Sequence, residues 1–425
     1  MAARIAVYCL LLPVIIAPLL LGGARLWALA ILILCLGIGV MVGSFTQQRI
    51  HAPILAKIWL AGLLLGGWMV VQSLPLFGPA DFPKIDSTIA LNPSALPAGL
   101  LMLLFCLLAF TLAQILRPDG NLIIRIVIAS ALIQAVLAGI LAGFEVPTNL
   151  WFAKTAHIGD ATGSFANRNA FGALMVIGIL GCLHQWGRAV GPLMHRLDRQ
   201  GGWIALAIVL SAALIATHSR ASMISLATGL MAMIVFAPMA RRKIIMSVIP
   251  LAVMLLILSD TTLTARFAEL ARPDFLQRDD LWRTALAAIA ARPLAGYGMG
   301  GMDLVIDHFA TPGLNMAARW PNSHNLFLDA ALCFGLPVAF IGIAAILAFA
   351  VRILRAAAPS KDRALLAGFV TIILTHALFD SVIILPALIL PILILAGSTV
   401  PVPPATREAN RGDAEPDGQP VTAGR

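Results

Sequence analysis

Charged residues are scarce in this chain. They make up 12% of its 425 residues, whereas 60% are hydrophobic; soluble domains hold roughly 25% charged and 45 to 50% apolar residues. This composition excludes a soluble globular protein. The net charge of +9 is spread over the edges of apolar runs and forms no basic domain, so nucleic acid is not an expected partner. The sequence predicts a polytopic membrane protein surrounded by a lipid bilayer.

Metal-binding, cofactor-binding and paired-cysteine motifs are also lacking. His308 and His324 are not joined by an HExxH pattern or by carboxylates at ligand spacing, so no metal site is predicted. Gly296-x-Gly298-x-x-Gly301 fits a dinucleotide fingerprint formally, but a helical pattern and a proline precede it instead of a strand. We interpret it as a bend that folds the loop back toward the membrane, and no cofactor is expected. The cysteines fall inside apolar runs without paired spacing, which indicates small buried hydrophobes: Cys9, Cys35, Cys106, Cys182 and Cys333.

Apolar runs long enough to cross about 30 Å of hydrocarbon recur along the chain. They predict an all-α fold, a polytopic transmembrane bundle of about 12 helices. The alternative is about 11 helices, because the last two runs are nearly continuous from Arg363 to Ala396. The runs begin near Ile5, Leu26, Leu55, Leu96, Leu122, Asn167, Gly202, Ala221, Ile244, Phe327, Arg363 and Val382.

The distribution of lysine and arginine predicts the topology. These residues gather in alternate loops, which places both termini in the cytoplasm by the positive-inside rule. The transmembrane domain is expected over residues 1–398, with one long periplasmic loop at about 260–325. Residues 399–425 are polar and aperiodic, which predicts a disordered cytoplasmic tail. The first run lacks a convincing cleavage site, so it is interpreted as a retained helix.

Two short polar segments at the outer ends of the runs contain unusual chemistry. Asn167, Arg168 and Asn169 place two amides and a fixed charge before one apolar run; they are either a substrate-binding group or an asparagine-capped helix start. Arg220 lies in a short turn between two other runs. Its guanidinium there can snorkel to lipid headgroups or receive a phosphate.

The long loop contains the third group. Arg278 and Trp282 are four residues apart in a helical pattern, so they are expected on one face of an interfacial helix. Trp282 has the plainer interpretation of a membrane-interface anchor. The loop ends at His324 and Asn325, where the next apolar run begins. An ionisable side chain at this position is costly, and it indicates a function.

Taken in order, these motifs resemble the O-antigen ligase and polymerase superfamily of integral-membrane glycosyltransferases. The resemblance spans about Gly163 to Asp380, and the order of the motifs is more specific than any single one. The motifs are Gly163-x-Phe165-x-Asn167-x-Asn169, Ser219-Arg220, Arg278-x-x-x-Trp282, Pro293-Leu294-x-Gly296-x-Gly298, His324-Asn325 followed by Gly335, and His376 to Asp380.

The resemblance implies a function. Members take a glycan from undecaprenyl diphosphate on the periplasmic face of the bacterial inner membrane and pass it to a saccharide or lipid A core acceptor, without metal. It implies that Arg220 and Arg278 hold the diphosphate and that His324 is the catalytic histidine, acting either as a base or as a hydrogen-bond donor. The predicted substrate-binding residues around them are Asn167, Arg168, Asn169, Trp282 and Asn325.

The exact activity stays open at this point. Ligases, polymerases and protein O-oligosaccharyltransferases share these motifs. An alternative from another class is a transporter or flippase of a lipid-linked or anionic substrate, with the arginines as anion sites. The enzyme is favoured because the polar residues gather on one face and the paired broken helices of many transporters are not evident.

Overall fold

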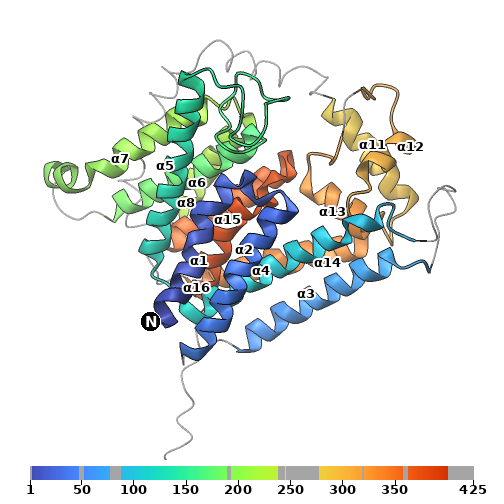
Figure 1. Ribbon diagram of the computed structural model, residues 1–425, viewed down its shortest axis with the longest axis horizontal. Helices are drawn as coiled ribbons and strands as arrows, with labels where there is room; N and C mark the ends of the chain where they lie inside the picture. The colour runs from blue at the N-terminus through green and yellow to red at the C-terminus, as the bar shows by residue number, and fades with distance from the viewer. Residues whose placement is uncertain are drawn as a thin grey trace, which may run out of the picture.

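The computed structural model describes residues 2–46, 52–76, 88–188, 193–237, 245, 277–317, 320–357 and 362–400. Over these ranges the regular elements are helices (Figure 1), and the only β-pairing is an isolated bridge between Thr148 and Ala153. The predicted all-α class is confirmed. The α-helices are α1 (Ala2–Leu19), α2 (Leu26–Gly43), α3 (Ala52–Ser73), α4 (Leu96–Leu116), α5 (Gly120–Gly143), α6 (Arg168–Gly187), α7 (Leu193–Ile215), α8 (Arg220–Phe236), α11 (Arg278–Ala291), α12 (Met302–Phe309), α13 (Leu326–Phe334), α14 (Leu336–Ala356), α15 (Arg363–Phe379) and α16 (Pro386–Thr399).

Seven helical stretches among the described residues are long and apolar enough to cross a membrane: α1 to α6, with short 3₁₀ extensions of α2 and α4, and α14. Shorter apolar stretches occupy most of α7 and all of α8, α15 and α16. A multi-pass membrane protein is therefore confirmed, and the total of about 12 spans stays a prediction. The run predicted near Ile244, most of the first part of the long loop and residues 401–425 lie outside the described ranges.

The run predicted to cross as one span from Phe327 is divided in the structure. α13 ends at Phe334 and α14 begins at Leu336, with Gly335 between them at a φ of +81°. A β-carbon on Gly335 would collide with the carbonyl group of Leu294. Glycine is therefore required at position 335, where the bend that begins at Pro293 packs against the break between α13 and α14. The backbone N–H of Leu336 donates to the carbonyl of Pro293 at 2.7 Å. The bend folds back onto the helices, as its sequence predicted.

α8 and α15 pack closely and run antiparallel. Gly229 of α8 faces Gly368 of α15, and a β-carbon on Gly229 would lie 3.6 Å from the carbonyl oxygen of Gly368. Small residues allow such close approach of helix backbones in membranes. Toward the C-terminal end of α15, Thr375 contacts Thr228 of α8 at 3.0 Å. This packing brings the start of α8 beside the end of α15.

Helices α11, α12 and α13 form a second, smaller hydrophobic core. Leu281 and Ala285 of α11 pack there with Tyr297 of the bend and Val305 of α12. The hydroxyl of Tyr297 donates to the carbonyl of Ala288 at 2.8 Å. In Figure 1 this unit stands on the opposite side of the bundle from α7. It fixes the first turn of α11, and with it Arg278, against the bundle.

Candidate functional site

Three helix ends meet at one end of the bundle. α6 begins after Asn167, whose side chain accepts from the backbone N–H of Asn169 at 2.7 Å. α8 begins after Ser219, whose hydroxyl accepts from the N–H of Ser222. α15 ends at Phe379, and the next residue, Asp380, accepts from the N–H of Val382 and caps the next short helix. Unpaired backbone groups at helix ends need such polar partners, and the caps gather polar side chains at one place.

Asp380 lies at the centre of this group and is fully buried. Its Oδ1 is 3.5 Å from Nδ1 of His324, and its Oδ2 accepts from Nδ2 of Asn169 at 2.5 Å. Burial by itself raises the pKa of this carboxyl, but the hydrogen bond and charge of His324 and the hydrogen bond from Asn169 lower it to about 2. Asp380 is therefore ionised at any physiological pH.

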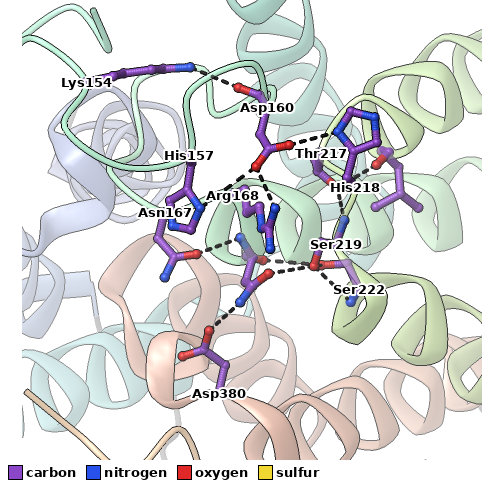
Figure 2. A network of polar contacts seen from close by, with 12 residues as sticks. Lys154, His157, Asp160, Asn167, Arg168, Thr217, His218, Ser219, Ser222 and Asp380 are labelled. Carbon is purple, nitrogen blue, oxygen red and sulfur yellow. Dashed lines mark hydrogen bonds and ion pairs between the residues drawn. The ribbon is translucent and has the colours of Figure 1, made fainter. Parts of the chain in front are cut away.

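Asn169 is held in one orientation by two partners. Its Nδ2 donates to Asp380, while its Oδ1 accepts from the hydroxyl of Ser219 at 2.7 Å. Figure 2 shows Asp380 and Ser219 on separate segments, with Ser222 beside Ser219. Because an amide has distinct donor and acceptor ends, this chain of bonds links α6, α8 and the end of α15 and orients the Asp380 carboxylate.

The arginines from the loop and the bundle converge on the same place. Burial lowers the pKa of Arg278, the nearby Asp380 carboxylate raises it, and the positive charges of Arg220 and Arg168 lower it further. Arg278 therefore lies within electrostatic range of two other guanidiniums, although it is distant from both in sequence. Both Arg278 and Arg220 are half-buried. Such a cluster favours an anion that binds between the guanidiniums.

The loop that holds His324 is fixed by a second carboxylate, Asp329. The backbone N–H and the hydroxyl of Ser323 donate to Oδ1 of Asp329 at 2.8 and 2.6 Å, and the hydroxyl of Ser381 donates to its other oxygen. The indole N–H of Trp282 donates to the carbonyl of Ser323 at 3.0 Å. His324 itself has a φ of +53°, an uncommon conformation for a histidine. The surrounding bonds hold it there.

The imidazole of His324 faces Asp380 and is partly exposed. Its Nδ1 lies 3.5 Å from Oδ1 of Asp380, and the ring of Trp320 stands edge-on to it with 6.3 Å between ring centroids. The side chain is 26% exposed. The ring can therefore be reached by a molecule that enters the site.

A second polar network, centred on Asp160, adjoins the first. Its Oδ2 accepts from Arg168 at 2.6 Å, and its Oδ1 contacts Nδ1 of His218 at 2.8 Å. Lys154 donates to the backbone carbonyl of Asp160 at 2.9 Å, and His157 lies 3.9 Å from its carboxylate. Figure 2 shows these side chains around Asp160. Arg168 thus has a carboxylate partner on the side of Asp160.

The predicted site residues separate into two groups. Asn169, Arg220, Arg278 and His324 converge around Asp380, and Arg168 joins them through its charge. The other three have contacts within the fold. The predicted catalytic and substrate-binding roles of all eight residues stay predictions. Asn167 caps α6, Asn325 caps α13 and Trp282 donates to the carbonyl of Ser323.

Sequence reasoning did not select several residues of these networks: Asp160, His218, Ser219 and Asp380. Asp380 is the last residue of the motif that begins at His376. A lone carboxylate between two apolar runs is a signal that could have selected it. Within the described ranges, His, Cys, Asp and Glu nowhere form a group of three suited to a metal ion.

A comparison with known protein families matches part of the chain. Residues 205–343 match the family model described as O-antigen ligase, whereas no curated protein matches the chain. The matched segment runs from α7 into α14 and contains Arg220, Arg278 and His324. Asn169 and Asp380 lie outside it in sequence and join the site only through folding. Residues 205–343 therefore contain an O-antigen ligase domain, which supports the resemblance to the O-antigen ligase and polymerase superfamily.

Proposed function

We propose that the protein is a membrane glycosyltransferase that moves a glycan from a polyprenyl-diphosphate donor, of the undecaprenyl-diphosphate type, to a hydroxyl on a sugar or lipid-sugar acceptor. The reaction is proposed on the periplasmic face of a bacterial inner membrane, with both chain termini in the cytoplasm. The family match supports the glycosyltransferase class. The donor, the acceptor and the face rest on the residues at the site.

The arginine cluster supports a diphosphate leaving group. When the bond between the sugar and the diphosphate breaks, negative charge grows on the phosphate oxygens. Arg220 and Arg278 are half-buried, and Arg220 is close enough to lower the pKa of the Arg278 guanidinium. Guanidiniums fixed in place before the reaction stabilise such charge without reorganising, as an oxyanion hole does. Their fork geometry also matches pairs of phosphate oxygens.

His324 is proposed as the general base. With Nδ1 facing the ionised Asp380, the neutral imidazole carries its hydrogen on Nδ1 and presents a lone pair at Nε2. The acceptor hydroxyl gives its proton to Nε2, its oxygen bonds to the anomeric carbon, and the bond from that carbon to the diphosphate oxygen breaks. The Asp380 carboxylate then stabilises the imidazolium. Attack opposite the leaving group inverts the anomeric centre.

The observation that carries this proposal is the pairing of His324 with Asp380 beside the three arginines. The test is transfer by purified protein in detergent, with a lipid-diphosphate-linked glycan and a sugar or lipid-sugar acceptor. We expect a glycosylated acceptor and one free lipid diphosphate per transfer. Detergent removes the sealed compartment, so a transporter has no measurable activity in this assay. Tight donor binding without transfer to any acceptor would contradict the enzyme and favour transport.

A further inference from the structure

A groove of about 730 Å³ lies beside the Asp160 network, between the ends of α5 and α7 that point toward the site. The segment between α5 and α6 covers part of it, and Ile158 of this segment is 79% exposed. Most of its lining is aliphatic: Ala138, Leu141, Ala142, Val146, Ile215 and Ala216. An apolar groove along two membrane helices suits a hydrocarbon chain.

One end of the groove is polar and adjoins the candidate site. Lys154, Asp160 and His218 line it there. Asp160 contacts Arg168 and His218 at once (Figure 2), and His218 is two residues before Arg220. Arg168 in turn is close enough to Arg278 to lower the pKa of its guanidinium. The hydrocarbon part of the groove therefore ends where the cations of the site begin.

We infer that this groove holds the isoprenoid chain of the lipid-linked donor, with the diphosphate at its polar end facing Arg220 and Arg278. The inference rests on the proposed function and specifies how the donor lies. In a polyprenyl diphosphate the chain is bonded directly to the diphosphate, so the chain must enter its groove within a few atoms of the arginines. An acyl chain of the acceptor has no such requirement, because its sugars separate it from the reacting hydroxyl.

The polar end of the groove carries charges of both signs. The carboxylate of Asp160 contacts Arg168 and His218, and Lys154 and Glu145 also line the groove. The position of the groove beside the arginines, and not the net charge of its lining, therefore favours this occupant. The aliphatic walls solvate the chain about as well as lipid does, so the groove positions the chain through its shape.

A tryptophan at Ala212 tests the inference. Ala212 is an exposed residue of α7 that lines the groove, and the indole would fill space that the chain needs. The matched control is Val209→Trp on the same helix, where Val209 is 45% exposed and is not part of the lining. Both variants and the wild type are assayed in detergent with two synthetic donors, one with a full-length polyprenyl chain and one with a chain of about two isoprene units.

For Ala212→Trp, we expect the KM of the long-chain donor to rise at least about tenfold, because the indole blocks the groove in which the chain lies when the diphosphate reaches the arginines; a tenfold change corresponds to about 1.4 kcal/mol. The KM of the short donor should stay unchanged, which also shows that the variant is folded. Val209→Trp should match the wild type with both donors. Equal KM values of Ala212→Trp and Val209→Trp for the long donor would overturn the inference.

A raised KM for a lipid-bearing acceptor, with the donor unaffected, would also overturn the inference and assign the groove to the acceptor chain. Absence of transfer by the wild type with either donor is a different result. It would contradict the proposed function itself.

Discussion

Asp380→Asn is the sharpest test of the site, because it removes a charge while keeping the shape of the side chain. The pKa of Asp380 is about 2 instead of 3.8, and each pKa unit corresponds to about 1.4 kcal/mol. Its surroundings thus favour the carboxylate by about 2 kcal/mol in spite of burial. His324 is the main source of this stabilisation, followed by Asn169. The same attraction stabilises the imidazolium that forms when His324 takes a proton.

Loss of the carboxylate should therefore lower kcat by at least about 30-fold, the equivalent of about 2 kcal/mol. The loss is larger if the new amide turns the imidazole into the tautomer with hydrogen on Nε2. An equivalent change in serine proteases costs about 10⁴. Donor binding should persist, because Arg220 and Arg278 are unchanged.

The assay is steady-state transfer by purified protein, together with a thermal melt. A purely structural role would lower the amount of folded protein without lowering kcat per folded molecule. The matched control is Asp362→Asn, which breaks contacts with His184 and Arg188 near the other end of α15. It should cost stability but keep turnover per folded molecule. Normal kcat in folded Asp380→Asn would refute the assignment of Asp380 to His324.

Three further variants test neighbouring parts of the site. Arg278→Lys keeps the charge but loses the planar fork, so steady-state assays should show most activity lost at normal protein levels; full activity would assign Arg278 to packing. His324→Ala should reduce turnover by roughly 10² to 10⁴ while a binding assay still detects the donor, and normal turnover would remove His324 from catalysis. Trp282→Phe removes the N–H that holds Ser323; we expect a loss of about 1 kcal/mol of stability, and an unchanged melt would show that this bond contributes nothing. Acid stability tests Asp380 independently: its lowered pKa contributes stability that is present above about pH 4 and lost as the pH falls toward 2, so melts of Asp380→Asn should change less over this range than those of the wild type.

The sequence by itself determined the class of the protein and most of the charged site residues. Long apolar runs satisfy their backbone hydrogen bonds in a membrane only by forming helices or closed barrels, and the helical outcome follows from runs that are continuously apolar. Arg220 and His324 could be selected because charged or ionisable groups at the ends of such runs are costly and need a reason. The division of the run after Phe327 was not predicted, because the conformation of Gly335 depends on Leu294 packing against it.

Only the tertiary structure decided which polar residues act together. Asn169 and Asp380 are 211 residues apart, and no local period or motif encodes their contact. They meet because Gly229 and Gly368 let α8 and α15 pack closely, which places three helix ends side by side. Arg278 joins them because the small core around Tyr297 holds the first turn of α11 against the bundle. Periodicity reports which face of a helix is apolar, whereas the partners of a polar group depend on contacts between segments that are distant in sequence.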